Sequence, residues 1–343
     1  MEMKRAVLVT GGAGYVGAIL IPKLLNQGYH VKVLDLYTYG EDVFDGVEDK
    51  SHLEEIKGDI CDQNLLKESL NGCESVIHLA CISNDPTFEL DPGLSRKVNF
   101  DAFEPLVRIS KENNVKRFIY ASTCSVYGVS DAEQVTEDHP LLPITDYNKY
   151  KGLCEPILSK YQSEHFTTVT IRPATVCGYS PRQRFDLSVN ILTNHAYNNN
   201  HIKVFGGKQE RPNIHIEDIT DLYVMLLELP KEKIAGNIYN AGYQNRSISD
   251  IAEIVKKEVK QAFPDREEPT IETTPSDDIR SYRISSEKIK RELNFAPKHT
   301  IEDAVKDLIK AFEADKFENS LENSRYFNVK TLKQDTPKEG ALN

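Results

Sequence analysis

Short apolar runs alternate with helical patterns through the first half of the chain. The runs have the length of buried strands, and they lie at residues 5–10, 31–34, 53–57, 75–79, 117–121 and 167–172. Segments with a helical spacing of apolar residues separate them, the longest at 92–113. Because strands that alternate with helices form parallel sheets, the pattern predicts an α/β fold built on a doubly wound parallel sheet.

The pattern changes after residue 173. More mixed segments follow, and they predict a helix up to residue 198, a strand at 201–205 and amphipathic helices at 249–263 and 301–315. We therefore expect a first domain at 1–173, a smaller α/β substrate-binding domain at 174–315 with some segments that return to the first domain, and a tail at 316–343. The apolar pattern fades in the tail, which we expect to be partly disordered or draped over the surface.

A glycine-rich turn, GGAGYVG at residues 11–17, joins the first predicted strand to a helix. Gly11 allows the tight turn, Gly14 lets the backbone approach a diphosphate, and Gly17 lets the helix pack closely on the strand. The start of the helix offers free N–H groups and the positive end of its dipole to phosphates. Because the glycines lie between a strand and a helix, they predict a dinucleotide site.

The next strand ends in Asp35, which lies 18 residues after Gly17. A carboxylate there accepts hydrogen bonds from a ribose diol and repels a 2′-phosphate. The following Leu36 and Tyr37 supply no cation, so the sequence favours NAD over NADP. Asp59 and Ile60, after the third strand, are candidates for the amino group and the face of the adenine.

A tyrosine and a lysine four residues apart, Tyr147 and Lys151, share one face of a predicted helix. A lysine ammonium beside a phenol favours the phenolate, so we expect a lowered tyrosine pKa and a base that works near neutral pH. Thr123 follows the strand at 117–121, and its hydroxyl is expected in the binding crevice at the carboxyl edge of the sheet. His78, at the end of another strand, is expected to be structural.

Composition mainly excludes classes of partner. The net charge of −11 argues against a nucleic acid, because phosphate backbones require a basic patch. No apolar run has transmembrane length and no signal-peptide pattern opens the chain, so we expect no membrane partner. The six cysteines form no Cys-x-x-Cys pair and the histidines show no ligand spacing, so we expect neither disulfides nor a metal site, and a cytoplasmic location.

Six motifs together resemble the extended short-chain dehydrogenases/reductases, and more narrowly their NAD-dependent nucleotide-sugar epimerase/dehydratase group. They are GGAGYVG at 11–17, GDI at 58–60, HLA at 78–80, STCSVYG at 122–128, YNKYK at 147–151 and RPNIHIED at 211–218. The resemblance covers about residues 4–315. It implies a Rossmann domain that binds NAD, a smaller domain that binds a nucleoside-diphosphate sugar, and an enzyme that oxidises C4 of that sugar, as a 4-epimerase.

The resemblance also implies roles for individual residues. Thr123, Tyr147 and Lys151 take the catalytic positions: Tyr147 accepts the proton of the sugar 4-hydroxyl, Lys151 also holds the nicotinamide ribose, and Thr123 bonds the reacting oxygen. The expected cofactor-binding residues are Gly11, Gly14, Tyr15, Val16, Gly17, Asp35, Asp59, Ile60, Leu79, Ala80, Tyr147, Lys151 and Pro173. The expected substrate-binding residues are Thr123, Ser125, Thr175, Arg182, Arg184, Asn190, Arg211 and Arg280, of which the arginines suit a diphosphate.

Two departures keep alternatives open. Thr175 stands where the sugar epimerases carry the asparagine of an R-x-x-N stretch, and SPRQRFDL at 180–187 resembles bacterial relatives that act on unusual sugars, some of them GDP-linked heptoses. Such relatives can stop at C4 oxidation, so a 4-dehydrogenase that releases a 4-keto sugar is the alternative. A 4,6-dehydratase is disfavoured, because Cys124 and Ser125 stand where dehydratases carry acidic groups. An NAD-sensing binding module without turnover would not need the catalytic set.

The resemblance also predicts a homodimer. The helices at 92–113 and 147–163 are the usual dimer elements of this family, and two from each subunit would form a four-helix bundle. We expect Phe103, Leu153 and Leu158 on their outward faces.

Overall fold

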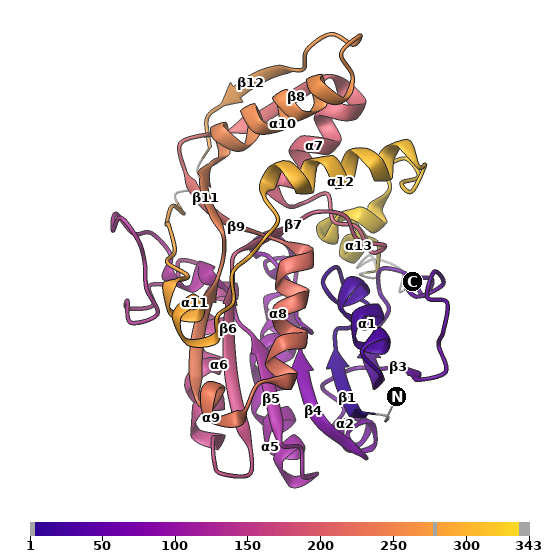
Figure 1. Ribbon diagram of the computed structural model, residues 1–343, viewed down its shortest axis with the longest axis vertical. Helices are drawn as coiled ribbons and strands as arrows, with labels where there is room; N and C mark the ends of the chain where they lie inside the picture. The colour runs from indigo at the N-terminus through magenta and orange to yellow at the C-terminus, as the bar shows by residue number, and fades with distance from the viewer. Residues whose placement is uncertain (1–3, 277–279, 336–343) are drawn as a thin grey trace, which may run out of the picture.

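The computed structural model describes residues 4–276 and 280–335. Its centre is a seven-stranded sheet in the order β10-β6-β5-β4-β1-β2-β3, with neighbouring strands parallel (Figure 1). The strands are β1 Lys4–Thr10, β2 Tyr29–Asp35, β3 Leu53–Lys57, β4 Cys73–His78, β5 Arg117–Ala121, β6 Thr167–Pro173 and β10 Asn237–Ala241. The predicted doubly wound parallel sheet is confirmed, and β10 joins it from the second half of the chain.

Helices cover both faces of this sheet, and alternate side chains of β1 pack against the helices on opposite faces. Val7 and Val9 pack with α1 (Gly17–Asn26), α8 (Ile216–Glu228) and α11 (Glu287–Leu293). Leu8 points the other way and packs with α2 (Gln63–Ser69), α5 (Phe103–Glu112) and α6 (Asp146–Tyr161). The short α9 (Lys231–Ile234) leads into β10.

The strand order reverses direction beside β1. The chain goes from β1 to β2 and β3 on one side, and then returns to β4, β5 and β6 on the other. In open parallel sheets such a switch leaves a crevice at the carboxyl ends of the strands, where ligands bind. Residues that follow β1, β2, β4, β5 and β6 therefore converge on one edge.

A second region lies above that edge in Figure 1. It contains a three-stranded sheet, β11-β9-β7, and a two-stranded sheet, β12-β8. The strands are β7 Thr175–Cys177, β8 His201–Phe205, β9 Glu210–His215, β11 Gln244–Ser247 and β12 Thr270–Thr274. The helices α7 (Ser188–Asn199), α10 (Ile248–Ala262) and α12 (Ile301–Glu313) share their own hydrophobic core, which includes Val189, Val255 and Val305.

The long helix expected at 92–113 is broken. It consists of α4 (Pro92–Arg96), a π-helical turn at Lys97–Asp101 and α5, and a short α3 (Asp85–Phe88) precedes it. The π-turn places the Asn99 amide in the interior, where its Nδ2 donates to the Ile82 carbonyl and its Oδ1 accepts from the Ile82 N–H. The extra residue in the turn is the physical reason for the break.

The described part of the tail is packed rather than only draped over the surface. It forms a 3-10 turn at Ser324–Tyr326 and α13 (Asn328–Asp335). Tyr326 is buried in an aromatic cluster with Phe185 and Phe312. Arg325 pairs with Asp42 of the loop after β2. The rest of the predicted tail, 336–343, lies outside the described residues.

The prediction of which residues lie on the outward faces of the dimer helices is partly wrong. Phe103 and Leu158 are each 1% exposed, because both pack against the sheet in the core that holds Leu8. Leu153 is 41% exposed, as expected. In the described ranges, no helix combines the length and apolar character that a membrane crossing requires.

Candidate functional site

A cleft of about 890 Å³ follows the carboxyl edge of the seven-stranded sheet and extends under the second region. Every residue expected to bind the cofactor lines it: Gly11, Gly14, Tyr15, Val16, Gly17, Asp35, Asp59, Ile60, Leu79, Ala80, Tyr147, Lys151 and Pro173. The substrate candidates Thr123, Ser125, Thr175, Arg182, Arg184, Arg211 and Arg280 line the same cleft. The folded chain therefore brings together residues that are almost 270 positions apart.

The glycine turn has the geometry that a dinucleotide requires. Gly11 has φ +72°, and a Cβ there would lie 2.5 Å from the Ala80 nitrogen. A Cβ on Gly17 would lie 2.1 Å from the Gly12 carbonyl oxygen, so this glycine is needed for helix packing. At Gly14 the nearest atom to such a Cβ is the Gly11 oxygen at 3.1 Å, and no other lies within 4 Å. The turn is thus closed on the protein side and open toward the cleft, which fits a diphosphate at the start of α1.

Asp35 is fixed by the backbone around it. Its Oδ2 accepts from the Ala13 N–H at 3.0 Å, and its Oδ1 accepts from the Tyr37 N–H at 2.9 Å. Burial raises the pKa of this carboxyl above its ordinary value, although these two N–H groups act in the opposite direction. The carboxylate has lone pairs left for the two hydroxyls of a ribose.

The catalytic candidates meet where β5 and α6 reach the cleft. Thr123 follows β5 and caps a 3-10 turn at Cys124–Tyr127, and its Oγ1 lies 2.8 Å from the Ser125 Oγ. Tyr147 and Lys151 lie one turn apart on α6, as predicted. Lys151 is 3% exposed, and its Nζ donates to the Ala121 carbonyl at 2.5 Å.

The expected lowering of the tyrosine pKa is wrong for this structure. Desolvation in the cleft raises the pKa of the Tyr147 phenol well above its ordinary value, and nearby Cys81 and Asp85 raise it further. The Lys151 ammonium lies 4.8 Å from the centroid of the Tyr120 ring and is held by a backbone carbonyl. The phenol therefore needs a further positive charge in the cleft before it can act as a base near neutral pH.

The far end of the cleft carries Arg211, Arg280 and Asp85. Arg280 forms an ion pair with Asp85, and Arg211 donates to the Arg280 carbonyl. The Thr145 hydroxyl, at the start of α6, also donates to Asp85. Two guanidinium groups in the cleft that also holds Tyr147 fit a diphosphate-linked substrate.

The loop at 178–187 carries the other two arginines. Arg184 forms a two-point contact with Asp186, with Nε 2.8 Å from Oδ1 and Nη2 3.2 Å from Oδ2. Burial opposes ionisation of Asp186, but Arg184 holds the pKa of this carboxyl below its ordinary value. The Arg182 guanidinium lies over the Tyr39 ring, with its Cζ 3.7 Å from the ring centroid, beside the Asp35 end of the cleft.

Asn190 does not line the cleft, so the structure contradicts its expected substrate contact. It is fully buried, and its Nδ2 donates to the Tyr15 hydroxyl at 3.0 Å and to the Arg184 carbonyl at 2.9 Å. Its Oδ1 accepts from the Gly178 N–H at 3.1 Å. The residue therefore positions the 178–187 loop against the glycine turn.

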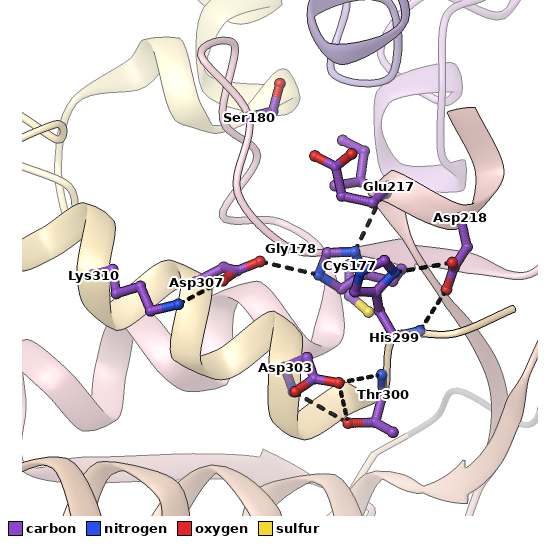
Figure 2. A network of polar contacts seen from close by, with 12 residues as sticks. Cys177, Gly178, Ser180, Glu217, Asp218, His299, Thr300, Asp303, Asp307 and Lys310 are labelled. Atoms are coloured by element: carbon purple, nitrogen blue, oxygen red, sulfur yellow. Dashed lines mark hydrogen bonds and ion pairs between the residues drawn. The ribbon is translucent and has the colours of Figure 1, made fainter. Parts of the chain in front are cut away.

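A polar network fixes the base of the same loop (Figure 2). The buried His215 ends β9, and its Nε2 lies 3.5 Å from Oδ2 of Asp307 on α12. His299 and Asp218 bind each other beside it, with the Nδ1–Oδ1 distance 2.9 Å. Gly178 has φ +115°, and a Cβ there would lie 3.0 Å from the His215 Nε2, so a larger residue would be strained where the loop leaves this network.

His78 behaves as expected. It is 4% exposed, its Nδ1 lies 2.7 Å from the Thr10 Oγ1, and burial lowers its pKa to about 3. Cys124 is also buried against β6, with its Sγ 2.9 Å from the Arg172 carbonyl oxygen. Burial raises the pKa of this thiol, so it packs and does not ionise. In the part of the chain with described coordinates, no group of three or more His, Cys, Asp or Glu is placed to hold a metal ion.

Sequence reasoning missed Asp85, Tyr39 and Asn328, all of which line the cleft. Asp85 had one usable signal, since Asn84-Asp85-Pro86 after a predicted strand is typical of a helix start at the carboxyl edge. Asn84 indeed caps α3. Tyr39 and Asn328 lie in a loop and in the tail, where no periodic pattern marks them.

Comparisons with known proteins agree with this geometry. The sequence profile of the NAD dependent epimerase/dehydratase family matches residues 7–242. A probable UDP-arabinose 4-epimerase 3 of Arabidopsis thaliana is 27% identical over 327 residues, which cover 86% of this chain and 77% of that protein. A dTDP-glucose 4,6-dehydratase of Streptomyces niveus is 24% identical over 319 residues, which cover 88% of this chain and 91% of that protein.

The solved structures agree as well. The UDP-glucuronic acid 4-epimerase of Bacillus cereus, determined with UDP-glucuronic acid and NAD, has a TM-score of 0.80 and 27% identity. The match covers 90% of this chain and 99% of that one. The predicted resemblance to the NAD-dependent nucleotide-sugar epimerases and dehydratases is thereby confirmed, and with it the expected NAD dependence of the family.

Proposed function

The chain belongs to the NAD dependent epimerase/dehydratase family, and from this premise we propose that it is a 4-epimerase of a nucleoside-diphosphate sugar. The observation that carries the proposal is the meeting of Thr123, Tyr147 and Lys151 with Arg211 and Arg280 in one cleft. A non-catalytic NAD-sensing module would have no use for both sets. The epimerases among the relatives of the chain support the same reaction.

The residues divide the work by position. Asp35 and the glycine turn bind the two ends of the adenosine diphosphate, and Lys151 holds the nicotinamide ribose. When bound there, NAD would supply the acceptor and donor of hydride at C4, with hydride returned to the opposite face in the epimer, and its positive charge would favour the phenolate. Tyr147 accepts the proton of the 4-hydroxyl and later returns it, while the Thr123 hydroxyl bonds the reacting oxygen.

The diphosphate end decides which substrates enter. Arg211 and Arg280 are assigned to the substrate diphosphate, because guanidinium groups match phosphate oxygens with two parallel hydrogen bonds. Thr175 supplies a hydroxyl from the start of β7, where epimerases of the family carry an amide. This difference favours a sugar other than those of the relatives, and a GDP-linked heptose is one such candidate.

Two other outcomes for the sugar are possible in this family. Release of the ketone would make the protein a 4-dehydrogenase. Dehydration needs an added acid and base beside the tyrosine, and the two positions after Thr123 supply a buried thiol and the hydroxyl of Ser125. Asp85 is a carboxylate that acts on the Tyr147 phenol, but Arg280 and Thr145 hold it. We therefore expect no loss of water.

One experiment separates these reactions. The enzyme is incubated with UDP-, GDP-, dTDP- and CDP-linked sugars, and the products are examined by mass and by C4 stereochemistry. An unchanged mass with inverted C4 is the expected result. Loss of two hydrogens would replace the epimerase by the 4-dehydrogenase, and loss of water in an amount above that of the enzyme would contradict the proposal. The Tyr147→Phe variant serves as the negative control.

We further propose a homodimer in the cytoplasm. Leu153 on α6 is 41% exposed and does not line the cleft, which suits a face that packs against a second copy. The six cysteines are all unpaired, as a reducing compartment requires. Light scattering at micromolar concentration should give twice the mass of the chain, and Leu153→Glu should lower it. A monomer for the unmodified protein would contradict the dimer.

A further inference from the structure

Arg182 is a buried cation whose hydrogen-bonding capacity is mostly unused. Its side chain is 3% exposed, and only Nη2 has a hydrogen-bond partner, the Asn328 Oδ1 at 2.5 Å. Within the described residues, Nε and Nη1 have none. A buried guanidinium with unused N–H groups is costly, and such groups normally face an acceptor.

The local charge makes an anion the fitting acceptor. Burial and the neighbouring Arg184 lower the pKa of Arg182 to about 10, and Tyr39, Asp186 and Asp35 offset this only in part. Asp186, the carboxylate between these arginines and α7, is already bound by Arg184. The chain as a whole carries a net charge of −11, so a buried excess of positive charge at this point is local and specific.

The position of Arg182 identifies which anion. The residues before it are tied to the glycine turn, since the Ser180 Oγ donates to the Tyr15 carbonyl at 2.8 Å and the Tyr15 hydroxyl donates to the Gly178 carbonyl at 2.7 Å. On its other side the guanidinium stacks on Tyr39, in the loop that follows Asp35. Arg182 therefore lies between the phosphate-binding turn and the ribose-binding carboxylate. In NAD the group between these two points is the adenosine phosphate of the diphosphate.

We propose that Arg182 binds the diphosphate of the NAD cofactor, and that Asn328 of α13 holds its guanidinium in place. The carboxyl-terminal helix thereby becomes part of the cofactor site. Asn328 is 2% exposed, and it is itself anchored, because its Nδ2 donates to the Ser83 Oγ at 2.8 Å and its N–H donates to Asp186. The inference rests on the proposed function only for the binding of NAD, and not for the reaction at the sugar.

The test measures binding without any sugar. Labelled NAD is exchanged into the holoenzyme, and its release is followed by mass spectrometry, with ADP and adenosine as competitors. In Arg182→Gln we expect release about ten- to hundredfold faster and an equal loss of affinity for ADP, because a charge-assisted hydrogen bond to phosphate is lost. Adenosine has no phosphate, so its affinity should not change.

Two further variants make the test decisive. Asn328→Asp keeps the shape of the side chain but gives Arg182 an internal anion, so it should also weaken ADP and spare adenosine; it carries the test alone if the glutamine variant does not fold. Arg266→Gln is the matched control, since Arg266 also stacks on an aromatic ring, that of Phe263 at 3.9 Å, but does not line the cleft.

Three results would overturn the inference. Equal losses for ADP and adenosine would give Arg182 only a role in the shape of the cleft. Unchanged binding of both would remove it from the cofactor site. Weaker binding of UDP- or GDP-sugars with NAD release unchanged would assign Arg182 to the substrate, as the sequence alone suggested. If the 4-epimerase assay fails, all of these binding measurements can still be interpreted, because none of them depends on sugar turnover.

Discussion

The two ends of the cleft are built in different ways. The cofactor end is made largely of backbone: glycines that leave room, N–H groups at the start of α1, and a carboxylate held by the Ala13 and Tyr37 N–H groups. The substrate end is made of charged side chains held by other charged side chains, with Arg280 on Asp85 and Arg184 on Asp186. A backbone site is ready before its ligand arrives, whereas paired charges must be shared or exchanged when the ligand binds.

A buried ion pair also occurs away from the cleft, where it has a structural role. Arg172 on β6 binds Glu155 on α6 at two points, with the two side chains 4% and 3% exposed. This pair joins the sheet to α6, the helix that carries Tyr147 and Lys151, and does not line the cleft. Arginine–carboxylate pairs therefore occur both in the packed interior and in the cleft. Whether a pair lines the cleft distinguishes a structural pair from one that a ligand can reach.

The largest expected effect concerns Tyr147, the proposed catalytic base, where the two ends meet. Tyr147→Phe removes the proton acceptor with little change of volume, so kcat should fall about 10²- to 10⁴-fold while nucleotide-sugar binding and NAD content persist. Lys151→Met should be nearly as damaging. Tyr150→Phe, on the same helix with its ring against Phe88 and Phe100, is the control and should keep full activity. Full activity of the Tyr147 variant would refute the mechanism.

The structural ion pair should give a large loss of stability. Glu155→Gln leaves the Arg172 guanidinium buried without its counter-charge, which typically costs about 3–5 kcal/mol of unfolding free energy. Glu112→Gln is the control, because the Arg108–Glu112 pair is exposed and such pairs contribute less than about 1 kcal/mol. Chemical denaturation measures both. Equal losses in the two variants would show that burial does not distinguish the pairs.

The cofactor end should respond to a change at Asp35 with a moderate loss of affinity. Asp35→Ala removes a charged acceptor for the ribose diol, so NAD should bind about ten- to hundredfold more weakly. Discrimination against NADP should relax, because the carboxylate that repels a 2′-phosphate is gone. Asp35→Asn, which keeps the shape, separates the charge from the packing. Calorimetry with NAD and NADP checks this, and tighter binding of NADP than NAD by the unmodified protein would contradict it.

How much the sequence predicted follows from how local each feature is. The glycine turn, Asp35 and the pair Tyr147–Lys151 lie within short stretches, so spacing and strand ends were enough to place them on the cleft. Asn190 was misplaced because its position after an arginine-rich loop does not tell whether the amide points into the cleft or back to Tyr15. Phe103 and Leu158 were misplaced because an apolar helix stripe does not identify the surface that covers it.

The prediction of a lowered pKa for Tyr147 was wrong for a different physical reason. The helical spacing of Tyr147 and Lys151 is correct, but it says nothing about desolvation, which depends on how the second region closes the cleft. Residues that act on the phenol, such as Asp85 and Tyr282, come from distant parts of the chain. Local geometry could therefore be predicted from the sequence, whereas the electrostatic environment could not.

The smallest expected effect tests whether the substrate end tunes Tyr147, which lies where the two ends meet. Asp85 lies among the charges that raise the pKa of the Tyr147 phenol. An anion near the phenol disfavours the phenolate, so Asp85→Asn should lower that pKa. Tyr147 must be deprotonated to accept the proton, so activity is lost as pH falls through its pKa. The acid limb of the pH profile of kcat/KM should therefore move to lower pH in Asp85→Asn. Asp146→Asn removes an exposed charge next to Tyr147 in the sequence, outside the cleft, and should leave the limb in place. A limb that stays in place in Asp85→Asn would show that Asp85 does not act on Tyr147, and a limb that moves to higher pH would contradict the expected sign.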